Sequence, residues 1–354
     1  MKQFAVTYDN TLLILSKEQG KYRIEANFEG ANPLAVAQDP MDHNILYCGT
    51  FDRGLWKSSD LGASWKPIGT RFKHHDAFAE NDIHMTHITT LAAFNLTGGQ
   101  SILLVGTEPS ALFASYDQGE SFELISDFND IPSKAQWFFP PRPHTHHVKW
   151  LTSNIKEPQN IYGTIEAGGM VYSTDYGKTW SAPNNTEAPV DIHVLRVHPK
   201  YPNQLYGVCG DAFLEGGRST FVYNEDYGAT WSDINVGIEH KYGFGLAVNS
   251  EKDYNFVIAT SNSPYNAHHY GEDTFSTLYY VDDSDQWTEV TAGLPEREGT
   301  LVSAVPESMG VFYVANNKGI FYSEDGGQQW SSLNISWPEE LTQQHAHQII
   351  WLDY

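Results

Sequence analysis

The feature that most constrains this chain is an eight-residue pattern that recurs five times. The copies are SSDLGASW (58–65), SYDQGESF (115–122), STDYGKTW (173–180), NEDYGATW (224–231) and SEDGGQQW (323–330). In each copy the aspartate can accept N–H groups of a tight turn, the glycine tolerates positive φ, and the aromatic residue can pack beneath a strand. Regular recurrence of this kind predicts repeated supersecondary units.

Runs rich in β-forming residues precede the pattern, as in DIHVLRVHP, NQLYGVCGD and STFVYNED before GATWSDIN. We assign such runs to strands A to D of one antiparallel sheet, which places the pattern at the C–D turn. Six sheets are expected to begin near Leu34, His87, His147, His193, Phe244 and Leu301. The N-terminal KQFAVTY, TLLILSKEQG and KYRIEANF, with the C-terminal HAHQIIWLDY, supply a seventh. The sequence therefore predicts one all-β domain over 1–354, a seven-bladed β-propeller closed by its two ends.

The five copies resemble the Asp-box (BNR) repeat, Ser-x-Asp-x-Gly-x-Thr-Trp, at nearly every position. The likeness spans nearly the whole chain and is greatest to bacterial BNR-like and sialidase-like repeat proteins. Asp-box propellers include sialidases, sortilin-type receptors and photosystem II assembly factors. The resemblance therefore implies a fold and leaves the activity open.

The charge balance narrows the choice of partners. The 21 Lys and Arg against 44 Asp and Glu give a net charge of −23, which repels nucleic acid and anionic membrane surfaces. The first twenty residues lack the continuous apolar run of a signal peptide. Cys48 and Cys209 lie far apart in apolar runs, so we expect buried free thiols and a reducing cytoplasm.

Four of the predicted inner strands begin with histidine: His87 in HITTL, His147 in HVKWL, His193 in HVLRV and His347 in HQIIW. Because these residues occupy the same place in their blades, we expect their imidazoles to meet at the mouth of the channel. A set of four imidazoles without a thiolate suits a divalent transition metal, namely Fe, Mn, Cu, Ni or Zn. An error of one residue in register would replace them by His84, His144, His146 or His345.

Carboxylates end the second strand in three of the same blades, at Glu108, Glu166 and Asp211. A metal-bound imidazole usually donates its other N–H to a carboxylate or carbonyl, so we predict that these groups orient the ligands or shuttle protons. Tyr8, beside the last blade's histidine, is a fourth candidate for that role.

The pattern thus predicts a metal-dependent enzyme acting on a small molecule, by lyase, hydrolase or oxygenase chemistry. The alternative is a non-catalytic scaffold with a protein partner, in which DIPSKAQWFFPPRPH (130–144) either anchors that partner or caps the channel. A sialidase-like glycoside hydrolase ranks last, because the Arg-Ile-Pro motif of sialidases is missing from the sequence.

Overall fold

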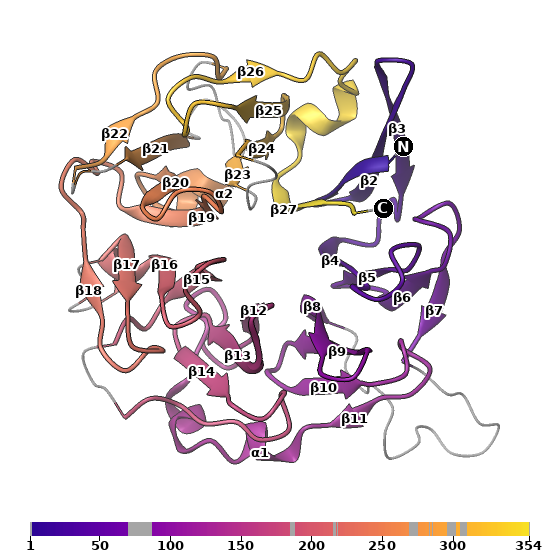
Figure 1. Cartoon of the computed structure of the whole chain (residues 1–354), viewed down its shortest axis with the longest axis vertical. Coiled ribbons are helices and arrows are strands. Elements are labelled where there is room, and N and C mark those ends of the chain that lie inside the picture. Colours follow the sequence, from indigo (N-terminus) through magenta and orange to yellow (C-terminus); the bar gives the residue numbers. More distant parts are fainter. Residues whose placement is uncertain are drawn as a thin grey trace.

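Seven antiparallel sheets form a ring in the computed structural model, with one edge strand of each sheet nearest the central axis (Figure 1). The structure describes residues 2–69, 87–184, 188–214, 217, 219–268, 275–282, 284, 286–295, 302–304 and 310–353. The predicted seven-bladed β-propeller is confirmed.

Each blade runs from an inner strand at the channel to an outer strand at the rim. In that order the strands are β4 (Pro33–Gln38), β5 (Leu46–Thr50), β6 (Gly54–Ser58) and β7 (Lys66–Ile68); β8 (Ile88–Leu96), β9 (Gln100–Thr107), β10 (Leu112–Ser115) and β11 (Glu123–Leu124); β12 (Val148–Asn154), β13 (Glu157–Ile165) and β14 (Gly169–Ser173); β15 (Ile192–Val197), β16 (Leu205–Cys209), β17 (Phe221–Asn224) and β18 (Ser232–Asp233); β19 (Tyr242–Val248), β20 (Asn255–Ser261), β21 (Thr277–Asp282) and β22 (Thr288–Glu289); β23 (Val302–Ala304), β24 (Phe312–Asn316), β25 (Gly319–Ser323) and β26 (Ser331–Ser332); and β27 (Ala346–Trp351), β1 (Lys2–Tyr8), β2 (Thr11–Glu18) and β3 (Lys21–Asn27).

Short helices occupy the connections between strands. They are α1 (Ser126–Asn129), α2 (Pro264–His268), η1 (Pro132–Gln136), η2 (Asp211–Phe213) and η3 (Glu339–Gln343), the last three being 3-10 helices. Among the described residues no helix is long and apolar enough to cross a membrane.

The inner strands begin within two residues of their predicted starts; the predicted start at Leu301 lies outside the described residues. The last blade closes the ring as expected, because β27 pairs with β1 in the register Phe4 to Trp351 and Val6 to Ile349. This pairing hydrogen-bonds what would otherwise be two open sheet edges.

The repeated pattern forms the turn between the third and fourth strands. In the first copy the Ser58 hydroxyl donates to Asp60 (2.7 Å) and accepts the Gly62 N–H (2.7 Å), while Asp60 accepts the Ser64 N–H (2.8 Å). Gly62 has φ +84°, a conformation that costs a glycine little. The pattern is therefore a self-contained structural turn on the face where the third strands end.

The hydrophobic core lies between neighbouring blades. One cluster, for example, joins Leu103 and Val105 of β9 to Tyr47 of β5 and Leu55 of β6. Glycine allows this close packing: a Cβ on Gly106 would lie 2.7 Å from the Val148 Cβ of the next blade. Cys48 and Cys209 are buried free thiols, as expected.

Candidate functional site

A cavity of about 570 Å³ lies at one end of the central channel. Its walls come from the first residues of inner strands, the ends of second strands and the adjoining loops, so it lies on the face opposite the Asp-box turns. The lining includes the carboxylates Asp9, Glu108, Glu166 and Asp191, the imidazoles His147, His193, His268, His345 and His347, and the aromatic rings Phe51, Phe139, Trp150, Tyr242 and Phe244. Convergent polar groups on aromatic walls are typical of a ligand site.

Glu166, which follows β13, lies between a lysine and a histidine of the cavity. Its Oε2 lies 2.8 Å from Lys149 Nζ and 3.0 Å from His147 Nε2. Burial alone would raise the pKa of Glu166, but the charges of Lys149 and His147 outweigh it and hold that pKa well below its usual range. Glu166 is therefore ionised at neutral pH.

Asp191, in the loop before β15, lies beside Glu166. One oxygen of each carboxylate and one ring nitrogen of His193 lie within 4.8 Å of one another. Asp191 Oδ2 is 3.3 Å from His193 Nε2, and Asp191 Oδ1 accepts the N–H of Ala167 at 3.0 Å. His193 is 2% exposed; burial lowers its pKa, but the negative charges of Asp191 and Glu166 raise it by more. The cavity thus contains two buried carboxylates side by side.

Asp211 has a different role from the one predicted. Its Oδ1 accepts the backbone N–H groups of Val190 (3.1 Å) and Asp191 (2.6 Å), so it fixes the loop that carries Asp191. Burial and the charge of Asp191 raise the pKa of Asp211 to about 6. The carboxylate beside His193 is Asp191, which stands two residues before it in an extended segment, where alternate residues share a face.

Glu108 holds the loop that follows η1 over the cavity. Arg142 donates to both of its carboxylate oxygens, from Nε at 3.0 Å and from a terminal nitrogen at 2.7 Å. The Arg142 guanidinium also lies over the rings of Phe139 (4.9 Å) and Phe51 (5.5 Å). His147 Nδ1 is 3.6 Å from Glu108. The predicted cap within 130–144 therefore contacts its own domain.

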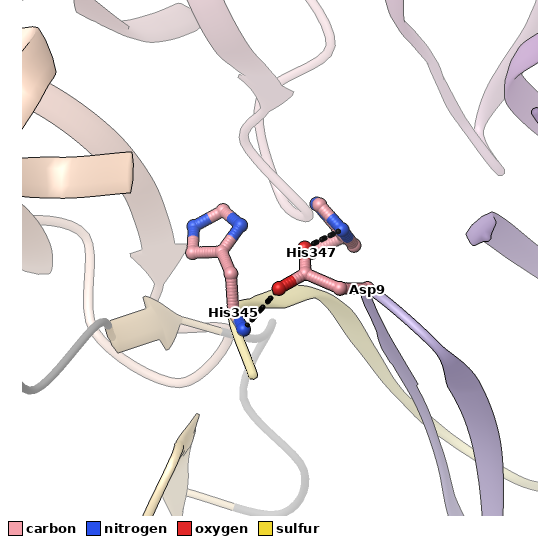
Figure 2. Close-up of side chains that lie close together, drawn as sticks. All are labelled: Asp9, His345 and His347. Atoms are coloured by element: carbon pink, nitrogen blue, oxygen red, sulfur yellow. Dashed lines mark hydrogen bonds and ion pairs between the residues drawn. The ribbon is translucent and has the colours of Figure 1, made fainter. Parts of the chain in front are cut away.

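A cluster of three side chains, Asp9, His345 and His347, joins the two ends of the chain, as Figure 2 shows. His347 Nε2 lies 3.0 Å from Asp9 Oδ1, and the backbone N–H of His345 donates to Asp9 Oδ2 at 2.7 Å. Tyr8 was the predicted group in this blade, but its side chain is fully buried and its hydroxyl donates to the Asn316 carbonyl at 2.9 Å. Asp9 lies one residue further on, where β1 has ended, and therefore reaches the cavity.

The four histidines predicted as ligands do not form one set. His147, His193 and His347 border the cavity, and their nearest carboxylates are Glu166, Asp191 and Asp9, respectively. His87 stacks on Phe51 at 4.1 Å between ring centroids. Within the described ranges, two groups bring three potential ligands within 4.8 Å, and each holds one predicted ligand: His193 with Glu166 and Asp191, and His347 with Asp9 and His345.

The one-residue alternatives had mixed outcomes. His345 joins the cluster with Asp9 and His347. His146 instead packs edge-on against Trp137, with ring centroids 5.6 Å apart. His144 is exposed on the loop, and His84 lies outside the described residues.

Comparison with known proteins finds one Asp-box repeat match and several propellers of similar fold. Residues 171–182 match the BNR/Asp-box repeat model. The "Probable oligoxyloglucan-reducing end-specific xyloglucanase" of Neosartorya fischeri is 22% identical over 315 residues, which is 85% of this chain and 34% of that protein. The crystal structure of a GH74 enzyme from Niastella koreensis is similar, with a TM-score of 0.62 at 17% identity over 93% of this chain and 51% of that one. YCF48 bound to D1 peptide is similar at a TM-score of 0.53 and 16% identity, over 85% of this chain and 80% of that one.

The chain spans 34% of the length of the xyloglucanase it matches. These similarities correct the predicted function, a metal-dependent enzyme that acts on a small molecule through four histidines. The relative with matching sequence is named as a xyloglucanase, the structures with matching fold are GH74 enzymes and YCF48, and the nearest carboxylate differs for three of the four histidines. The prediction was wrong because equivalent positions in different blades were taken as neighbours, whereas they are spread around the channel.

Proposed function

Starting from an Asp-box β-propeller with paired carboxylates at the mouth of its channel, we propose that this protein is a glycoside hydrolase acting on a neutral oligosaccharide. The observation that carries the proposal is the pair Glu166 and Asp191, both buried, with oxygens within 4.8 Å. Similarity to a protein named as a xyloglucanase supports it.

The cavity suits a sugar chain in size and lining. A volume of about 570 Å³ is within the ordinary range of ligand pockets. The rings of Phe139, Tyr242 and Phe244 offer flat apolar surfaces for the C–H faces of a pyranose, while Lys149 and Gln348 offer donors for its hydroxyl groups. A net charge of −23 disfavours an anionic glycan and leaves a neutral one unaffected.

The spacing of the two carboxylates favours a double displacement. Retaining glycosidases keep their carboxyl groups about 5–5.5 Å apart, whereas inverting enzymes need about 6.5–9.5 Å to fit a water molecule. In the proposed reaction the ionised Glu166 attacks the anomeric carbon. Asp191, which receives a proton from His193 Nε2 3.3 Å away, passes it to the departing glycosidic oxygen as the bond of that oxygen to the anomeric carbon breaks. Water then attacks the glycosyl-enzyme ester, giving its proton back to Asp191, and the sugar leaves with retained configuration.

The test is hydrolysis of xyloglucan oligosaccharides and of neutral aryl glycosides, with the anomeric configuration of the first product followed by proton NMR. Glu166→Gln and Asp191→Asn keep the shapes of the side chains and should each lower kcat on the order of 10³-fold or more. Glu157→Gln, at the start of β13 and outside the cavity lining, is the matched control. Wild-type rates in either cavity variant, or a product with inverted configuration, would remove the pair from the reaction.

A cytoplasmic location remains a prediction from the two cysteines and the N-terminal sequence. The absence of nucleic-acid and membrane partners likewise remains a prediction from net charge.

A further inference from the structure

We propose that Asp9, His345 and His347 form a binding site for one divalent transition-metal ion that ties the two ends of the chain together. This site is separate from the carboxylate pair and does not depend on the proposed hydrolysis. It also differs from the four-histidine centre predicted from the sequence, because only one of its three ligands belonged to that set.

The spacing of the three side chains fits a shared ion. One donor atom of each lies within 4.8 Å of the donor atoms of the other two. Two ligands at about 2.1 Å from a tetrahedral ion such as Zn²⁺ are about 3.4 Å apart. His347 Nε2 and Asp9 Oδ1 are 3.0 Å apart, so they need to separate by about 0.4 Å. The widest pair in the cluster, at most 4.8 Å apart, needs to close by about 1.4 Å at most.

The strand and its hydrogen bonds hold the ligands in place before any ion arrives. The backbone N–H of His345 donates to Asp9 Oδ2 at 2.7 Å and so directs Oδ1 at His347, as Figure 2 shows. His345 directly precedes β27 and His347 is its second residue, at the point where the register of β27 against β1 is irregular. Their rings are nearly perpendicular, at 87°, with centroids 4.7 Å apart. An arrangement held this way loses little side-chain entropy when it binds.

The donor set selects the class of ion. Two imidazoles and one carboxylate are ligands for Zn²⁺, Fe²⁺, Co²⁺ or Ni²⁺, whereas Ca²⁺ and Mg²⁺ prefer all-oxygen sites. All three residues line the cavity, so the ion's remaining coordination positions open onto it. Water or a hydroxyl group of a bound sugar would complete the shell.

An ion at this place would also stabilise the ring. Asp9 directly follows β1, and the two histidines stand at the start of β27, the strand that pairs with β1 to complete the seventh blade. A ligand that binds only the folded state raises its stability by mass action. Metal binding is therefore expected to raise the melting temperature by resisting separation of these two strands.

The experiment uses the full chain, stripped of metal with EDTA and titrated with Zn²⁺ in a calorimeter, followed by thermal melts with and without Zn²⁺. The wild type should bind one equivalent and melt at a higher temperature with Zn²⁺. Asp9→Asn combined with His347→Gln should weaken Zn²⁺ affinity on the order of tenfold or more and abolish the thermal shift. His43→Gln, which alters a histidine outside the cluster, should change neither.

A further variant distinguishes this cluster from the other group of potential ligands, Glu166, Asp191 and His193. Asp191→Asn should leave the Zn²⁺ isotherm unchanged. Zn²⁺ binding that survives the Asp9 and His347 changes, or that disappears with Asp191→Asn, would overturn the proposal. If the double variant does not fold, the same Zn²⁺ titration is made on His347→Gln alone. This single variant should fold, because His347 is 22% exposed and lies outside the core.

Discussion

Replacing Asp175 by alanine should destabilise the propeller and leave the cavity intact. Asp175 lies in the Asp-box turn after β14, on the face opposite the cavity. It accepts the N–H groups of Lys178 (3.1 Å) and Thr179 (2.9 Å) and the hydroxyls of Ser173 (2.8 Å) and Thr179 (2.7 Å).

The expected loss follows from these four hydrogen bonds. The turn is open to water, so each bond contributes at the low end of the usual range, about 0.5–0.8 kcal/mol, and together they contribute about 2–3 kcal/mol. A chain of 354 residues unfolds with an entropy of about 0.7 kcal/mol/K. The melting temperature should therefore fall by about 3–4 °C.

The assay is differential scanning calorimetry of the wild type, Asp175→Ala, Asp175→Asn and the control Asp52→Ala, which alters an exposed aspartate outside the boxes. Asparagine keeps a carbonyl acceptor, so the melting temperature of Asp175→Asn should lie between those of the wild type and Asp175→Ala. A shift in Asp175→Ala no larger than that of Asp52→Ala would refute the view that this carboxylate organises the turn.

Three further predictions concern other parts of the molecule. Hydrogen bonds within its box lower the pKa of Asp60 to about 2. The contribution of Asp60 to stability should therefore be present above pH ~4 and vanish as the pH falls through about 2. In urea unfolding, the difference in free energy of unfolding between the wild type and Asp60→Asn should be smaller at pH 2.5 than at pH 5. Gly106→Ala should lower the free energy of unfolding by about 1–3 kcal/mol, because the new Cβ would lie 2.7 Å from the Val148 Cβ; an unchanged urea midpoint would show that the blades are not so close. Arg142→Ala leaves Glu108, only 5% exposed, without its bidentate partner. This change should lower the free energy of unfolding by about 1–3 kcal/mol, and Arg142→Lys should recover only part of that loss in the same unfolding assay.

The blade architecture could be predicted from the sequence because its signals are local. Each Asp-box satisfies its own hydrogen bonds within about seven residues, as Ser58, Asp60, Gly62 and Ser64 do. Alternation of apolar residues then marks the strands on either side. The closure of the ring by β27 and β1 followed from counting strands, since one incomplete blade remained at each end of the chain.

The site was predicted less well, because its geometry depends on contacts between blades. His147 and His193 were correctly placed at the cavity, and Glu166 was correctly placed beside His147. Equivalence between blades, however, says nothing of the distance across a channel, which is set by the number of blades and their tilt. Asp9 and Asp191 were missed, although Asp9 directly follows the predicted Tyr8 and Asp191 lies two residues before the predicted His193. Their positions just before or after a strand were the available signal.

The pairing of β1 with β27 joins residues more than 330 positions apart, as in the hydrogen bond from His345 to Asp9. Contacts of such long sequence separation form late in folding, since the intervening chain must first be ordered. The same strand brings His345 and His347 to the cavity, so the cavity wall is unfinished until the seventh blade is made. A chain arrested with six blades formed would therefore have most of its core and an incomplete pocket, and binding of a cavity ligand would report on the last step of assembly.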